Sequence, residues 1–233
     1  MQILETSPLG LRAAHTVFVS RDSSVSVTLY PMVHVGEDQF YRQVFEKAFF
    51  SDVVLTEGLR SSVNRNLTRS YRWLDFRKLR LVRQPRTPTQ ENVPARIVLA
   101  DLAPEEFHHE WRKIPLWIRL FVAVLAPLYG IYLRYFASRE RLAENMSLED
   151  RKSAAEILGW SGEVESLENA LLHSRDKRLV ECLARELDSS SGETKQIAVV
   201  YGAQHMRAVL RELSRRGFYS AGSTWHTIFA LTD

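Results

Sequence analysis

The pattern of apolar and polar positions predicts strands at both ends of the chain. Val25, Val27 and Leu29 alternate with serine and threonine as on a half-buried strand, and residues 15–20 are expected to pair with it in a hairpin. Short continuous apolar runs that stop at a polar residue or a glycine predict buried strands. The further predicted strands are Asp52–Thr56, Ile97–Ala100, Ile197–Val200 and a last strand, Tyr219–Phe229.

Helical spacing of apolar residues dominates the middle of the chain. It predicts a helix over about residues 37–50, helices through most of 104–188, and a helix from Met206 to Leu213. Strands at both ends of a helical middle are typical of an α/β fold. We therefore expect a single domain over residues 1–233, with a mixed central β-sheet flanked by helices and a helical insertion at about 103–160.

The most apolar segment, Leu120–Leu133, lies inside this insertion between two arginines. It holds about 14 residues between the charges, fewer than the roughly 20 that cross a bilayer as a helix, and Pro127 and Gly130 are expected to interrupt it. A transmembrane span is therefore not expected. The surrounding residues 114–136 must still be covered, and burial in the domain or in a homodimer is expected ahead of a peripheral membrane contact.

Composition and charge narrow the classes of function. The chain is 45% hydrophobic and 25% charged, which is enough apolar material for a core, and its formal net charge is +3. One cysteine, Cys182, excludes an intramolecular disulfide and multi-cysteine zinc modules, and it suits a cytoplasmic, reducing compartment. Basic residues concentrate in 60–86, interleaved with aromatic residues, a pattern that could stack nucleic-acid bases or meet anionic lipid headgroups. Because no nucleic-acid motif accompanies them, we interpret this stretch as a solvated face and expect no nucleic-acid partner.

Three predicted strands end at residues that bind metals. His34 follows the strand that begins at Val25, Glu57 ends the strand at 52–56, and His205 lies between the strand at 197 and a helix. In open α/β sheets the carboxyl ends of the strands are where ligands bind. Imidazole and carboxylate ligands with positions left for water suit a divalent transition metal. The sequence therefore predicts a Mn²⁺, Co²⁺ or Zn²⁺ site formed by His34, Glu57 and His205.

At these residues the chain resembles the TraB/PrgY family, which is related to the Tiki metalloproteases and to the erythromycin-esterase and ChaN-like proteins. The resemblance rests on a strand–GxxH–helix arrangement near each end, with a strand-terminal glutamate after the first, and covers about residues 15–229. The second motif is intact as Gly202-Ala203-Gln204-His205. Further matches are Ala100-Asp101 after a strand, the run Trp111–Leu116, and Leu171-Leu172 followed by Arg175-Asp176 before a helix.

The resemblance implies an erythromycin-esterase/ChaN-like fold and a metal-dependent hydrolase, with peptide bonds as the substrate of the Tiki branch. A metal-activated water would attack a carbonyl, and Glu57 would be a metal ligand or the general base. Asp101 is implied to orient a histidine, and Arg175 to hold a carboxylate or a developing oxyanion. The alternative is a non-catalytic protein that sequesters a peptide or small ligand, because TraB/PrgY-like proteins resemble factors that block a peptide pheromone and ChaN-like proteins resemble haem binders.

The first motif departs from the family, because it reads Pro31-Met32-Val33-His34. Proline fixes φ at about −65° and has no backbone N–H to donate, whereas glycine can adopt a positive φ and keeps its N–H. We expect the metal site to be retained and the activity to be weak or narrowly selective. Pro31→Gly should raise hydrolysis more than metal affinity when both are measured on the two proteins. A gain in metal affinity of about tenfold or more, about 1.4 kcal/mol, would contradict this prediction.

Overall fold

A seven-stranded mixed sheet forms the centre of the protein. The computed structural model describes residues 1–58, 68–88, 93–146, 172–189 and 194–231. The strand order is β1-β2-β3-β8-β5-β7, with β9 paired to β2, and β4 and β6 form a separate small sheet. The strands are β1 (Leu4–Ser7), β2 (Gly10–Val19), β3 (Val25–Met32), β4 (Val35–Gly36), β5 (Val53–Thr56), β6 (Val82–Arg83), β7 (Arg96–Leu99), β8 (Lys195–Gly202) and β9 (Tyr219–Ala230).

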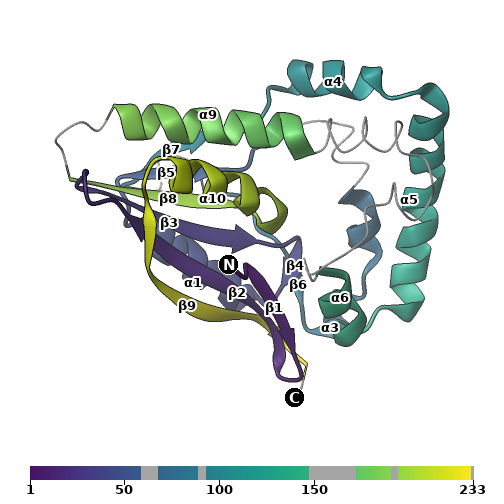
Figure 1. Cartoon of the computed structure of the whole chain (residues 1–233). Coiled ribbons are helices and arrows are strands. Elements are labelled where there is room, and N and C mark those ends of the chain that lie inside the picture. The colour runs from purple at the N-terminus through teal and green to yellow at the C-terminus, as the bar shows by residue number, and fades with distance from the viewer. Residues whose placement is uncertain (59–67, 89–92, 147–171, 190–193, 232–233) are drawn as a thin grey trace.

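Helices flank the sheet, which confirms the expected mixed α/β architecture. Helices α9 and α10 cover one face and α1 lies against the other, while α4, α5 and α6 extend beyond one end of the sheet (Figure 1). The expected insertion at 103–160 is helical up to residue 146, and its remainder lies outside the described residues. The helices are α1 (Asp38–Ala48), α3 (Phe76–Leu79), α4 (Pro104–Lys113), α5 (Leu116–Phe136), α6 (Arg139–Met146), α9 (Ser174–Asp188) and α10 (Met206–Arg215), with 3₁₀ turns η1 (Thr68–Trp73) and η4 (Ala203–His205).

The strands that carry the predicted site run parallel to one another. Strand β3 pairs with β8, β8 with β5, and β5 with β7, all in parallel register. Strand β5 (Val53–Thr56) is buried at every position, as expected for a parallel strand covered on both faces, whereas β3 keeps its alternation of buried and half-buried residues and β7 is partly exposed. Because parallel strands end at the same edge, the segments that follow β3, β5, β7 and β8 meet there.

A histidine without hydrogen-bond partners lies in the core between β2, β9 and α1. The side chain of His15 is 6% exposed, and neither of its ring nitrogens has a hydrogen-bond partner among the described residues. Its ring stacks on His226 at 4.0 Å and meets Tyr30 edge-on at 4.8 Å. Burial, followed by the charges of His226 and Lys47, lowers the pKa of His15 to about 3. His15 is therefore neutral in the folded protein at ordinary pH.

Replacing His15 by leucine should stabilise the protein in mild acid. The folded-state pKa of about 3 lies below the unfolded value near 6.5, so the unfolded chain binds the extra proton as the pH falls. Wild type therefore loses stability below about pH 6.5, and His15→Leu removes that loss. Urea unfolding should show the variant gaining about 2 kcal/mol relative to wild type between pH 7 and pH 5. The exposed His109→Leu serves as control; parallel pH dependence of wild type and His15→Leu would contradict the prediction.

Helix α5 is longer and more exposed than the sequence pattern indicated. It runs unbroken for 21 residues through Pro127 and Gly130, so the expected interruption was wrong. Pro127 removes one backbone hydrogen bond, and the helix formers around it continue the helix. A Cβ on Gly130 would lie 3.2 Å from the Trp73 ring, so this glycine lets α5 pack closely on η1.

By length and composition α5 is the one described helix that could cross a membrane, and 17% of its most apolar stretch is buried. The domain therefore buries only Ile118, Gly130 and Leu133 of α5 and leaves most of the helix exposed, while burial of the remainder in a homodimer stays a prediction.

Candidate active site

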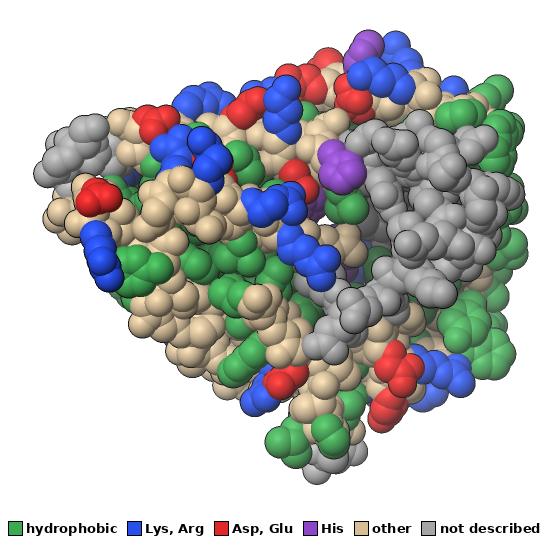
Figure 2. Space-filling model, in the orientation of Figure 1, with side chains coloured by type: hydrophobic (Ala, Val, Ile, Leu, Met, Phe, Trp, Pro, Cys, Tyr) green, Lys and Arg blue, Asp and Glu red, His purple; other side chains and the backbone are tan. Residues whose placement is uncertain are grey.

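Arg175 joins two of the predicted site residues at the carboxyl edge of the sheet. Glu57 directly follows β5, Asp101 follows β7, and Arg175 lies in the first turn of α9. Arg175 Nε and Nη2 donate to Oδ1 and Oδ2 of Asp101, each at 2.9 Å, and Nη2 also donates to Oε1 of Glu57. Histidine, basic and acidic side chains gather around the N-terminal end of α9 (Figure 2). The three predicted residues therefore form one charge cluster.

This charge cluster keeps Asp101 ionised. Burial alone would raise the pKa of Asp101, but the hydrogen bonds and charge of Arg175 hold it below the ordinary value. The backbone N–H groups of Leu102 (2.9 Å) and Gly58 (3.2 Å) also donate to this carboxylate. Burial alone would lower the pKa of Arg175, but the negative charges of Glu57 and Asp101 raise it overall. Asp101 therefore contacts Arg175 and backbone, and its predicted role in orienting a histidine stays a prediction.

The carboxylate that contacts His205 is Asp176. His205 is 4% exposed in η4, between β8 and α10, as expected from the sequence. Its Nδ1 donates to Oδ1 of Asp176 at 2.7 Å, because an ionised carboxylate only accepts. The other ring nitrogen, Nε2, is then left for chemistry. In the sequence, Asp176 lies next to Arg175 at the start of a helix. The pattern of apolar positions did not indicate that its carboxylate would contact His205.

Tyr201 is a second residue that sequence reasoning missed. Its ring meets His205 edge-on at 4.9 Å, and the guanidinium carbon of Arg175 lies 5.6 Å from the ring centroid. Arg175 Nη2 also approaches the tyrosine hydroxyl at 3.5 Å. The Tyr201 ring thus lies between His205 and Arg175. Because Tyr201 belongs to an apolar strand, the sequence pattern indicated an ordinary core residue.

Gly202 lets His205 and Glu57 approach each other. A Cβ built on Gly202 would lie 3.3 Å from Cδ2 of His205 and 3.5 Å from Oε2 of Glu57. The two side chains are thus neighbours across this glycine. This close approach gives the glycine of the second GxxH motif a physical role, since any side chain there would press on the histidine.

Gly202→Ala should slow catalysis with little loss of stability. Its φ of −51° suits alanine, but the added methyl must move His205 by a few tenths of an ångström. We expect hydrolysis to fall about tenfold to a hundredfold, because small displacements of a catalytic group are costly. Rate assays and urea unfolding on both proteins would measure this. Gly222→Ala is the matched control, since a Cβ there meets nothing within 4 Å, and equal rates for the two variants would refute the prediction.

His34 lies beside this cluster, between β3 and β4. Its carbonyl accepts the Gln84 N–H at 2.9 Å, and its ring lies 5.4 Å from the ring of Tyr71. The protein atoms around the ring desolvate it and lower its pKa. The charge of Glu57 acts in the opposite direction, while those of Arg175, His205 and Arg83 lower the pKa further. The pKa of His34 therefore lies below the ordinary histidine value, and its ring shares the electrostatic environment of the other site residues.

The predicted metal ligands share an edge of the sheet without forming a coordination group. Within the described part of the chain, no three His, Cys, Asp or Glu side chains are arranged to hold a metal ion. Glu57 binds Arg175 through one oxygen, and Nδ1 of His205 is held by Asp176. As placed, these residues do not fit a three-ligand metal site. Binding of Mn²⁺, Co²⁺ or Zn²⁺ by His34, Glu57 and His205 stays a prediction.

Pro31 lies buried near the end of β3. It pairs with Tyr201 in the parallel register, one position before the pair formed by Met32 and Gly202. The two motif segments therefore lie side by side at the ends of neighbouring strands. The predicted effect of Pro31→Gly on hydrolysis tests whether the contact between these two strand ends matters for activity.

Comparison with known proteins gives no further assignment. No family model, no curated protein and no solved structure matches the chain. The resemblance to the TraB/PrgY family therefore rests on the motifs themselves and stays a prediction.

Proposed function

We propose that the protein is a hydrolase that adds water to an acyl bond at the carboxyl edge of its sheet. The observation that carries this proposal is the pair of His205 and Asp176, placed next to Glu57 across Gly202. A histidine whose Nδ1 is bound by a carboxylate is the arrangement that general-base catalysis uses. A peptide bond is the proposed substrate, on the strength of the resemblance to the Tiki branch.

The proposed reaction begins with removal of a proton from water by Nε2 of His205. The water oxygen attacks the carbonyl carbon and forms a tetrahedral intermediate. Nε2 then returns the proton to the leaving nitrogen as the carbon–nitrogen bond breaks, which yields a carboxylic acid and an amine. The negative charge of Asp176 stabilises the imidazolium that exists between these two steps.

Glu57 and Arg175 have supporting roles in this proposal. Oε1 of Glu57 is held by Arg175, while Oε2 faces the side of Gly202 and is placed to orient the attacking water. Arg175 acts as a positioning residue, since its Nε and Nη2 groups bind Asp101 and Glu57. The oxyanion contact expected of Arg175 from the sequence stays a prediction.

The metal prediction can be tested separately from hydrolysis. No step of the proposed reaction passes through a metal ion. The prediction of a metal site requires elemental analysis of protein purified without chelator or affinity metal to detect stoichiometric Mn, Co or Zn in wild type and its loss in His34→Ala and His205→Ala. Absence of metal from wild type, even after each metal is added back, would contradict the prediction of a metal site.

Hydrolysis itself is tested with a peptide library. Wild type and His205→Ala are incubated with the library in the presence of chelator and with Mn²⁺, Co²⁺ or Zn²⁺ added in turn. Cleavage by wild type above the variant would support the proposal and show which ion, if any, the reaction needs. No cleavage above the variant under any condition would refute the hydrolase and favour the sequestering alternative.

A further inference from the structure

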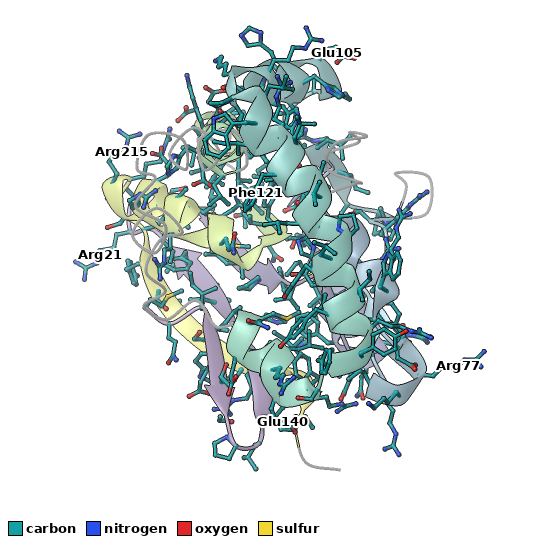
Figure 3. The ribbon with its side chains drawn as sticks, turned by 90° about the vertical axis from the view of Figure 1, so that its right-hand side faces the viewer. Arg21, Arg77, Glu105, Phe121, Glu140 and Arg215 are labelled. Atoms are coloured by element: carbon teal, nitrogen blue, oxygen red, sulfur yellow. The ribbon has the colours of Figure 1, made fainter. Side chains whose placement is uncertain are left out.

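Helix α5 presents a long apolar surface along one edge of the protein. Hydrophobic side chains line this edge in Figure 2, and in Figure 3 the helix faces the viewer over its whole length, with Phe121 in its upper part. Its 21 residues span about 30 Å. The exposed side chains include Leu116, Leu120, Val124, Leu128, Ile131 and Tyr135, with 42–71% of each surface accessible. Contiguous apolar surface of this length marks an interaction site.

The ends of α5 are both fastened to the same body. Helix α4 is held at its N-terminal end, because Phe107 is fully buried and Arg178 of α9 binds Glu106 at 2.5 Å. Helix α6 is held through Arg139, whose guanidinium donates to the carbonyls of Leu79 (2.9 Å) and Ala230 (2.7 Å). For α5 to cross a bilayer, one of these two attachments would have to pass to the other side. The helix therefore lies along the domain, with its axis parallel to the surface it presents.

The segment packed beside α5 is strongly basic. Residues 70–83 contain five lysines or arginines and a single acidic residue, Asp75. This segment includes most of η1, whose Trp73 contacts Gly130 of α5, and exposed basic side chains such as Arg77 project beside the helix (Figure 3). Helix α5 itself contains two arginines and no acidic residue. The apolar surface is thus bordered by positive charge.

We propose that α5 lies in the plane of an anionic lipid bilayer, with its exposed side inserted among the headgroups and upper acyl chains and the basic side chains of residues 70–83 bound to acidic headgroups. Apolar burial together with basic residues is the combination that holds interfacial helices on anionic membranes. A second copy of the chain would instead bring like-charged segments to a shared interface. This proposal does not depend on the hydrolase.

Vesicle sedimentation tests the apolar contribution. The full chain should sediment with vesicles of phosphatidylcholine and phosphatidylglycerol, and Leu120→Glu/Leu128→Glu should weaken binding at least about tenfold, since two charges then enter the apolar layer. The control is Leu9→Glu/Phe50→Glu, which adds the same charge at two exposed apolar positions elsewhere. Equal loss in both variants, or no binding by wild type, would overturn the proposal. Circular dichroism verifies that each variant is folded.

The electrostatic contribution is tested with Arg77→Gln/Lys78→Gln. Because each basic residue near an anionic surface contributes about a fivefold gain in binding, the variant should bind these vesicles at least about tenfold more weakly. Its binding to pure phosphatidylcholine should change little. High salt should reduce the difference between the two vesicle types, and binding that is indifferent to lipid charge and to salt would refute the proposed headgroup contact.

The orientation of α5 separates this proposal from two others. Cysteines introduced at Glu105 and Glu140, near the two ends of the α4–α6 unit in Figure 3, should both react with a membrane-impermeant maleimide on bound vesicles. The native Cys182 is buried, so the parent protein gives the background. Protection of one position would show a transmembrane span instead. Light scattering could instead show that wild type is a dimer and that Leu120→Glu/Leu128→Glu is a monomer. Together with no vesicle binding by wild type, this result would assign the surface to a second copy of the chain.

Discussion

Replacing His205 by alanine is expected to lower the rate of peptide hydrolysis by about 10²- to 10⁴-fold, the usual contribution of a general base. The variant removes Nε2, the atom that the proposed reaction uses twice, and leaves Asp176 without its partner. The measurement is the initial rate of wild type and variant on the same peptide at neutral pH. The exposed His109→Ala, outside the site on α4, should keep the rate of wild type.

Asp176→Asn separates a catalytic histidine from a merely structural one. The amide keeps the size of the carboxylate but loses the charge that stabilises an imidazolium, so hydrolysis should fall by about tenfold to a hundredfold with little change in the unfolding free energy. A structural role for the pair would instead lower stability and activity together. If His205→Ala hydrolysed peptide as fast as His109→Ala, His205 would not be the general base.

The sequence predicted the placement of the site because strand ends can be recognised from local pattern. His34, Glu57, Asp101 and His205 each follow an apolar run, and parallel pairing of β3, β8, β5 and β7 brings these ends to one edge. Local pattern does not predict the order of the strands in the sheet. Placing these residues at one edge requires only that the strands run parallel. The position of each side chain was thus predictable to the level of the sheet edge.

The contacts within the site were beyond the reach of sequence pattern. Arg175 and Glu57 are far apart in the chain, and their contact depends on how the start of α9 docks over β5. The same docking brings Asp176 to His205. Periodicity identifies a helix face and says nothing of which loop that face will meet. The continuous course of α5 through Pro127 and Gly130 escaped prediction for a related reason, since local pattern does not show that the packing of α5 on η1 outweighs the unfavourable helix propensity of these two residues.

Arg175→Leu should produce the largest loss of stability, about 3–5 kcal/mol at pH 7, because it leaves buried carboxylates without their cation. The side chain of Asp101 is 2% exposed and that of Glu57 is 19% exposed, so water cannot replace the guanidinium fully. Urea unfolding of both proteins at pH 7 gives the difference. The control is Arg178→Leu on the same helix, whose ion pair with the half-exposed Glu106 should contribute at most about 1 kcal/mol.

The pH dependence of this loss identifies its cause. The pKa of Asp101 is held below its ordinary value, so the stability that Asp101 gains from Arg175 is present above the ordinary carboxyl range and is lost as the pH falls through the folded-state pKa. Without Arg175 the desolvated carboxyl accepts a proton at higher pH, so the gap in unfolding free energy between the two proteins should begin to narrow above the ordinary aspartate pKa of about 3.9 and continue to narrow below it. Asp101→Asn should also restore part of the stability of Arg175→Leu, because it removes one unpaired charge. If the difference in unfolding free energy between wild type and Arg175→Leu were constant with pH, or if the double variant were less stable than Arg175→Leu, lost packing rather than charge would explain the effect.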